Sequence, residues 1–141
     1  AKGLGILYIT PLRAVARDIE QALLAPIKDL KLPLTVGSRT GDTRQSVKQR
    51  QGKTLPHVLI TTPESFSLLL CRPNAQELFA SCQSVIVDEW HELIGSKRGT
   101  QLTLGLARLQ CWNPAVRVWG LSATLANLDQ AAQHLVGVER K

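Results

Sequence analysis

Short apolar runs alternate along the chain with longer stretches in which apolar residues recur at helical spacing. The strand-like runs cover residues 6–9, 34–36, 57–60, 84–87 and 117–121. Helical patterns cover residues 12–25, 75–80, 99–110 and 128–135, and two more end near Arg50 and begin at Pro63. Continuously apolar strands are typical of a parallel sheet covered by helices, and strand–helix alternation favours an α/β fold. We therefore expect residues 1–141 to form one domain, a three-layer α/β sandwich with a mostly parallel sheet.

Proline and small polar residues indicate where the helices begin and end. Pro26 and Pro33 bracket the connection after the first helix, because proline interrupts helices. Asp42 or Thr43 is a candidate N-cap for the next helix. Thr62 is expected to cap a third helix that starts with proline, a residue favoured at that position.

Polar, small or charged segments follow the predicted strands. They are Thr10-Pro11-Leu12-Arg13, Gly37-Ser38-Arg39-Thr40-Gly41, Thr61-Thr62-Pro63-Glu64, Asp88-Glu89-Trp90-His91 and Ser122-Ala123-Thr124. In open α/β sheets, ligands bind beyond the carboxyl ends of the strands. These segments are therefore the candidates for a functional site.

Two acids directly follow the apolar strand at residues 84–87, which is the Walker B arrangement of nucleotide hydrolases. Asp88 can hold Mg²⁺, usually through water. Glu89 is expected on the opposite side, where it can polarise the water that attacks the γ-phosphate of ATP. The alternative is a strand that ends in a solvated acidic turn, and His91 and Glu92 in the same turn argue against it.

Three other strand ends offer places for a phosphate group. Arg13 lies at the start of a helix, whose first N–H groups can bind an anion. Thr62 with the helix behind it, and the Thr40-Gly41-Asp42 turn, offer two more. Together they suggest a track for a nucleic-acid backbone. Ordinary helix capping is the alternative for each one taken alone.

Ser122 and Thr124 follow the last predicted strand. Their hydroxyl groups could hydrogen-bond the acidic turn and relay its state elsewhere. The alternative is that either residue only caps a helix.

The net charge is +6, and the whole surplus lies in residues 1–56, since residues 57–141 are balanced. This indicates either a surface for a polyanion or a solvated basic face. No apolar run approaches the roughly 20 residues of a membrane span. Cys71, Cys82 and Cys111 fit no zinc pattern, so we expect reduced thiols in a cytoplasmic protein without membrane contact.

A phosphate-binding loop is not found in the sequence. Gly52-Lys53-Thr54 resembles the tail of one, but Val47 stands where the loop needs glycine, and no strand precedes the segment. The chain also begins with Ala1 rather than methionine. We therefore expect a piece of a longer protein.

The strand-end segments, in this order, resemble the motifs of superfamily two DExH helicases. The matching segments are Thr10-Pro11-Leu12-Arg13-Ala14 (motif Ia), Arg39-Thr40-Gly41-Asp42-Thr43, Thr61-Thr62-Pro63-Glu64-Ser65 (motif Ib), Asp88-Glu89-Trp90-His91 (motif II) and Ser122-Ala123-Thr124 (motif III). Trp90 within motif II and the Gly95-Ser96-Lys97-Arg98-Gly99 segment behind it resemble the Lhr (large helicase-related) group. We favour its bacterial ligase-associated branch.

The resemblance implies a partial RecA-like first motor domain that lacks its first strand and phosphate loop. It implies ATP and Mg²⁺ as cofactors, 3′ to 5′ movement on single-stranded DNA, unwinding of DNA or DNA–RNA duplexes in DNA repair, and a second RecA-like domain. A DNA ligase or nuclease pathway is a further expectation. The isolated 141 residues should show negligible ATPase activity.

The resemblance also assigns roles to single residues. Asp88, Glu89 and His91 would be catalytic, with Asp88 on the metal, and Ser122 and Thr124 would couple the ATP site to DNA. The expected nucleic-acid contacts are Thr10, Pro11, Arg13, Thr40, Gly41, Asp42 and Thr62, while the roles of Lys97 and Arg98 stay open. The alternatives are a truncated, non-catalytic nucleic-acid-binding or regulatory module, and an RNA-remodelling helicase.

Overall fold

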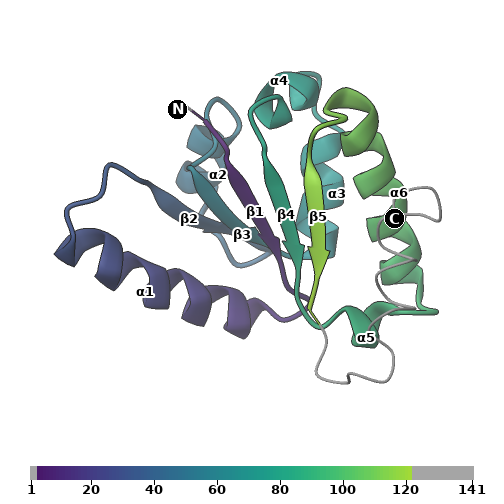
Figure 1. Cartoon of the computed structure of the whole chain (residues 1–141), viewed down its shortest axis with the longest axis horizontal. Helices are drawn as coiled ribbons and strands as arrows, with labels where there is room; N and C mark the ends of the chain where they lie inside the picture. Colours follow the sequence, from purple (N-terminus) through teal and green to yellow (C-terminus); the bar gives the residue numbers. More distant parts are fainter. Residues whose placement is uncertain (1–2, 122–141) are drawn as a thin grey trace.

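A five-stranded parallel sheet forms the centre of the molecule (Figure 1). The computed structural model describes residues 3–121, so Ser122, Thr124 and the helix predicted at residues 128–135 lie outside the described part. The strands lie in the order β2-β3-β1-β4-β5. Their bounds are β1 Ile6–Ile9, β2 Val36–Arg39, β3 Val58–Thr61, β4 Ser84–Val87 and β5 Arg117–Gly120.

Helices connect the strands and lie on two sides of the sheet (Figure 1). Their bounds are α1 Arg13–Asp29, α2 Gln45–Gln51, α3 Pro63–Leu70, α4 Ala75–Phe79, α5 Trp90–Leu93 and α6 Lys97–Trp112. The predicted three-layer α/β fold with a parallel sheet is thereby confirmed. None of the described helices is long and apolar enough to cross a membrane.

Helices cover one face of the sheet and bury its apolar side chains. Leu7, Leu59 and Val85 occupy equivalent positions on three adjacent strands, and all three are fully buried. They belong to one core cluster with residues of α3, α4 and α6, in which Phe66 and Phe79 meet edge to face at a centroid distance of 5.8 Å. Burial of this apolar face is the main contribution to stability that the sequence provides.

The other face is only partly covered by α1. Ser38 on β2 donates a hydrogen bond of 2.9 Å to Glu20 on α1, and Ala16 of α1 is the fully buried residue of that helix. Ile6 on β1 is 39 % exposed and Trp119 on β5 is 57 % exposed. Within residues 3–121, the helical cover on this face is therefore confined to the β2–β3 side.

Several predicted boundaries differ from those of the structure, and three of the differences have a physical reason. Pro26 lies inside α1, whose last turn continues because the N–H of Leu30 still reaches the carbonyl of Pro26. Strand β2 begins at Val36, two residues after the predicted start. Helix α2 has Arg44 as its N-cap, without a side-chain bond, because the Thr43 hydroxyl accepts from the N–H of Thr40 instead. The Thr62 cap of α3 is confirmed.

Candidate functional site

All the strand ends that the sequence singled out within residues 3–121 lie at one edge of the sheet, the lower edge in Figure 1. Parallel pairing places Ile9 opposite both Thr61 and Val87, so the segments after β1, β3 and β4 leave the sheet side by side. Arg39 pairs with Thr61 in the same way, which adds the turn after β2. The structure thus brings together the acidic turn and three candidate phosphate-binding segments.

The acidic turn after β4 is held through its backbone. The N–H of Asp88 donates to Ile9 of β1 at 2.7 Å, and the N–H of Trp90 donates to Leu121 beyond β5 at 3.0 Å. Between them, Glu89 adopts the left-handed conformation with φ of +54°. A non-glycine residue in that region stores strain of about 1–3 kcal/mol, which is commonly found at functional sites.

The two acids of the turn have different surroundings. Asp88 is half-buried and accepts the N–H of Glu89 at 2.9 Å. Glu89 lies 3.2 Å from the Nε2 atom of His91, and Glu92 lies 3.4 Å from the same atom. The imidazole therefore stands between two carboxylates. The catalytic roles of these side chains stay predictions.

Tyr8 is a neighbour of the acidic turn that the sequence analysis missed. Burial, a hydrogen bond with Asp88 and the negative charges of Asp88 and Glu89 raise the pKa of Tyr8 to about 12. Tyr8 pairs with Ile86, and Asp88 follows Ile86 on the same side of β4. Side chains two positions apart on a strand share a face, but the pairing of β1 with β4 that brings Tyr8 to this turn depends on the whole fold.

Trp90 has a structural role in the turn. It opens the short helix α5, which was not predicted, and is 2 % exposed within the core cluster that also contains Leu93. The tryptophan anchors the segment behind the two acids. Its indole nitrogen is buried and has no hydrogen-bond partner among the described residues.

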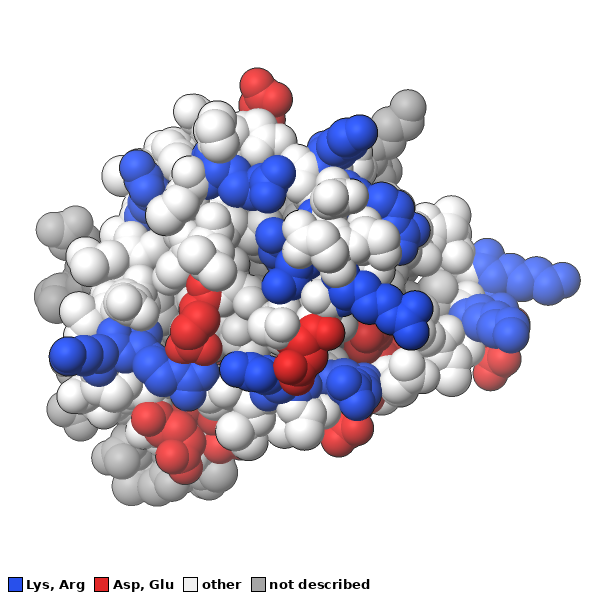
Figure 2. Space-filling model, turned by 180° about the vertical axis from the view of Figure 1, so that it is seen from behind, with Lys and Arg blue, Asp and Glu red and all other residues white. Residues whose placement is uncertain are grey.

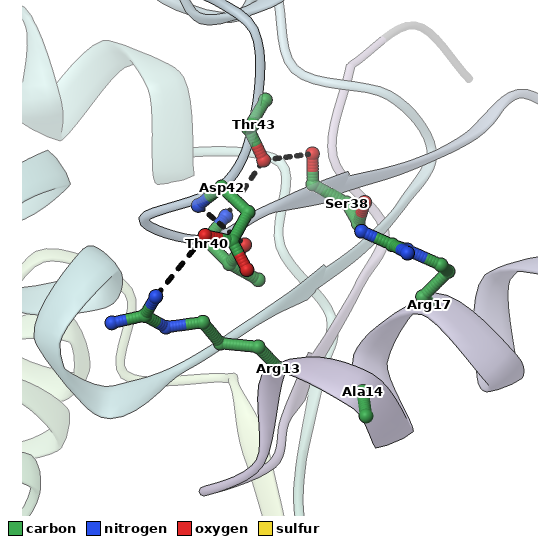
Figure 3. A pocket seen from close by; sticks show the side chains of 7 residues that line it. All are labelled: Arg13, Ala14, Arg17, Ser38, Thr40, Asp42 and Thr43. Carbon is green, nitrogen blue, oxygen red and sulfur yellow. Dashed lines mark hydrogen bonds and ion pairs between the residues drawn. The ribbon is translucent and has the colours of Figure 1, made fainter.

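A polar pocket of about 230 Å³ lies between α1 and the turn after β2 (Figure 3). Arg13 donates a hydrogen bond to Asp42 at 3.1 Å across its mouth. The turn itself is fixed because the N–H of Asp42 donates to the hydroxyl of Thr40 at 3.1 Å. Arg17, one turn after Arg13 on α1, extends into the same pocket. The i, i+4 spacing of the two arginines was the available signal for Arg17.

The predicted nucleic-acid residues fall into two groups. Arg13, Gly41 and Asp42 are exposed and Pro11 is partly exposed, whereas the threonines are buried. The buried threonines are Thr10, Thr40 and Thr62. The hydroxyls of Thr40 and Thr62 hold their loops: that of Thr62, for example, accepts the N–H of Ser65 at 3.4 Å. The buried hydroxyl of Thr10 has no hydrogen-bond partner among the described residues. Direct contact with a nucleic acid stays a prediction for every residue of both groups.

The segment behind α5 is shaped by its glycines and its serine. Gly95 has φ of +80°, a conformation that suits glycine. Ser96 caps α6 by accepting the N–H of Gly99 at 3.1 Å. A Cβ at Gly99 would overlap the carbonyl oxygen of Leu93. Lys97 is exposed on this turn.

Arg98 connects three segments of the site. Its guanidinium group binds both carboxylate oxygens of Glu64 at 2.6 and 3.0 Å, and it donates to the carbonyl of Pro11 at 2.9 Å. The hydrogen bonds from Arg98 lower the pKa of Glu64 below its ordinary value, and the charge of Arg13 contributes further. Sequence reasoning left Arg98 open because its partners lie 34 and 87 positions away.

Basic and acidic side chains alternate along this edge. Figure 2 shows Lys and Arg interleaved with Asp and Glu in the lower part of the molecule, where the strand ends lie. Two ion pairs at the strand ends, Arg98–Glu64 and Arg13–Asp42, combine the two kinds of charge. The row is therefore partly neutralised by its own acids.

The model of the family described as DEAD/DEAH box helicase matches residues 1–131. The chain belongs to the DEAD/DEAH box helicase family. Within this family it is 43 % identical to the ATP-dependent helicase Lhr-Core of Saccharolobus solfataricus, over 96 % of this chain and 16 % of that protein. It is 38 % identical to the Lhr helicase/uracil glycosylase of Escherichia coli, over 94 % of the chain and 9 % of that protein.

A solved helicase structure agrees with this assignment. The helicase Lhr of Mycobacterium smegmatis, bound to single-stranded DNA and AMP-PNP, superposes with a TM-score of 0.81 at 40 % identity, covering 94 % of this chain and 18 % of that chain. The resemblance to the Lhr group is thereby confirmed, while the ligase-associated branch stays a prediction. The chain spans about one sixth of the Lhr-Core relatives that it matches.

Proposed function

We propose that this chain supplies part of the first motor domain of an ATP-dependent helicase that moves 3′ to 5′ on single-stranded DNA and unwinds DNA or DNA–RNA duplexes. The single observation that carries the proposal is the shared sheet edge, where the acidic turn lies beside three segments suited to phosphates. Its similarity to Lhr helicases supports the same reading.

The acidic turn fits a hydrated magnesium ion. Asp88 is a half-buried carboxylate at a rigid strand tip, and oxygen ligands are those that Mg²⁺ prefers. Bound there with the phosphates of ATP, the ion would neutralise negative charge. Tyr8 is a neighbour of this carboxylate, which contributes to the raised pKa of the Tyr8 hydroxyl.

Glu89 and His91 carry the chemistry next to Asp88 in this proposal. Glu89 has a left-handed backbone, and its carboxylate lies 3.2 Å from the imidazole of His91. Glu89 polarises the water that attacks the γ-phosphate. His91 passes the state of this turn to the nucleic-acid side, together with Ser122 and Thr124, which lie outside the described residues.

The nucleic-acid track runs over the ends of β1, β2 and β3. Arg13 and Arg17 give the pocket at the start of α1 its positive charge, and the first turn of α1 contains no acid and no side-chain cap. A helix start in that condition suits a phosphate. Gly41 and Asp42 border the track, and Thr10, Pro11, Thr40 and Thr62 give the loops their shape.

The wider setting is also part of the proposal. We place the protein in the cytoplasm, where its three free cysteines stay reduced, and in DNA repair, with a second RecA-like domain and a ligase or nuclease pathway beside it. An RNA-remodelling helicase is the second candidate, because contacts to phosphates do not distinguish DNA from RNA. A non-catalytic binding module gives no reason for the strained Glu89.

The test is ATP turnover and strand separation by the full-length protein, with DNA and RNA substrates bearing 3′ or 5′ single strands. Glu89→Gln should lower stimulated turnover at least about a hundredfold, the scale of a lost general base. Glu92→Gln is the matched control, because Glu92 also contacts His91 but is exposed, and it should change turnover less than about threefold. Near-normal turnover in Glu89→Gln would reject the proposal.

A further inference from the structure

Arg98 is the one described residue that makes side-chain hydrogen bonds to both helicase-like loops after β1 and β3. It donates to the carbonyl of Pro11 in the first loop and to both oxygens of Glu64 in the second. We propose that Arg98 is a positioning residue that joins these two loops to the start of α6 and thereby to the acidic turn. This inference rests on the proposed function for its effect on nucleic-acid binding.

The geometry favours positioning over direct contact with a phosphate. A guanidinium group that binds both oxygens of a carboxylate forms a planar, two-bond pair, and in Arg98 one nitrogen also binds a backbone carbonyl. Most of its donor capacity is therefore used inside the protein. Lys97, its neighbour, is exposed and makes no described side-chain hydrogen bond or ion pair.

The first turn of α6, which carries Arg98, is held in place by several contacts. The Ser96 hydroxyl donates to Leu93 at 2.7 Å and accepts the N–H of Gly99 at 3.1 Å. The backbone of Gly99 packs directly against the carbonyl of Leu93, where a side chain would not fit. The first turn of α6 is thus fixed to the end of α5.

Helix α5 connects the first turn of α6 to the acidic turn. Glu89 is the N-cap residue of α5, and Trp90 and Leu93 anchor the helix in the core. Arg98 follows Glu89 by only nine positions (98 − 89). A displacement of the acidic turn would therefore be transmitted to Arg98 through a short, packed segment, and from Arg98 to the loops after β1 and β3.

Hydrogen exchange of the full-length protein tests the positioning role directly. Arg98→Ala should speed exchange about fivefold or more in the loops at residues 10–13 and 61–65, because about 1 kcal/mol of local stability is lost. Lys97→Ala, the matched control, should leave both loops unchanged. Reversing the pair with Glu64→Arg and Arg98→Glu should restore the second loop but not the first, because a carboxylate cannot donate to the Pro11 carbonyl. Unchanged exchange in either loop of Arg98→Ala would overturn the proposal.

Salt dependence of single-stranded DNA binding distinguishes positioning from contact. Arg98→Ala should weaken binding several-fold while the slope of log affinity against log salt stays as in the wild type, since no phosphate contact is lost. A slope reduced by about one unit, or unchanged affinity, would overturn the proposal. A wild type that neither binds nucleic acid nor hydrolyses ATP rejects the proposed function instead, and hydrogen exchange still decides the role of Arg98 in that case.

Discussion

Two arginine–carboxylate pairs connect segments at the same edge of the sheet, yet they differ in the number of hydrogen bonds and in how much of the arginine is exposed. Arg98 and Glu64 form a two-bond pair, their side chains are 41 % and 51 % exposed, and a backbone carbonyl accepts a third bond. Arg13 and Asp42 share a single bond of 3.1 Å and are 62 % and 54 % exposed. The first pair holds three segments together, whereas the second leaves most of the Arg13 guanidinium available.

This difference separates two uses of arginine within one site. An arginine that donates two hydrogen bonds to a carboxylate and a third to a backbone carbonyl would lose these bonds if it turned to an external ligand. A single exposed pair contributes about 0–1 kcal/mol and is easily exchanged for a phosphate. Arg13 is therefore suited to binding a phosphate, which would replace Asp42 as its anionic partner. Arg98 is suited to holding the surrounding loops together.

The largest expected effect on stability comes from substituting the glycine that lies next to each pair. Gly99→Ala should destabilise the protein by about 2–4 kcal/mol, because the new methyl group would overlap the Leu93 carbonyl and force backbone movement. Gly41→Ala is the control beneath the other pair, where a Cβ would lie 3.4 Å from the Arg13 guanidinium carbon, and it should cost less than about 0.5 kcal/mol. Chemical denaturation measures both, and equal losses would contradict the distinction.

Double-mutant cycles should show a smaller difference between the pairs themselves. Arg98→Ala combined with Glu64→Gln should give a coupling free energy of about 1 kcal/mol, the upper range for partly exposed pairs. Arg13→Ala combined with Asp42→Asn should give less than about 0.3 kcal/mol. Urea unfolding of the single and double variants provides both values. A stronger Arg13–Asp42 coupling would reverse the assignment of the two arginines.

The sequence predicted the sheet and the location of its site better than it predicted how the site is held. The β1 and β4 strands and the Thr62 cap were correct because each depends on local patterning. Strand β2 was shifted, since Gly37 and Ser38 carry little strand propensity and are recruited by pairing with β3.

Contacts between distant segments were beyond local patterns. Tyr8–Asp88 and Arg98–Glu64 depend on which strands become neighbours, and the order β2-β3-β1-β4-β5 is a property of the whole fold. The exposed side chain of Trp119 is a similar case: no helix within residues 3–121 covers it, although the run at residues 117–121 resembles a strand covered on both sides.

Nucleic-acid binding should separate the two arginines again, with a modest effect on affinity. Arg13→Ala should weaken single-stranded DNA binding and reduce the salt slope by about one unit, because one phosphate contact is lost. Its effect on thermal stability should be negligible, since its ion pair is exposed. Asp42→Asn removes the competing anion and should strengthen binding slightly at low salt. Fluorescence titrations at several salt concentrations measure these effects, and an unchanged slope in Arg13→Ala would remove Arg13 from the track.

The smallest effect is the pH dependence of the Arg98–Glu64 pair, and its sign is fixed. Hydrogen bonds from Arg98 lower the pKa of Glu64 below 4.5, so the folded protein binds this proton less readily than the unfolded chain. The stabilisation is therefore complete above pH 4.5 and is lost as the pH falls through the lowered value. Melting curves of the wild type and Glu64→Gln should be separated at neutral pH and converge in acid. In an Arg98→Ala background most of that separation should disappear, because the main cause of the lowered pKa is gone. A separation that grows on acidification would show that the carboxylate is not held by Arg98 in solution.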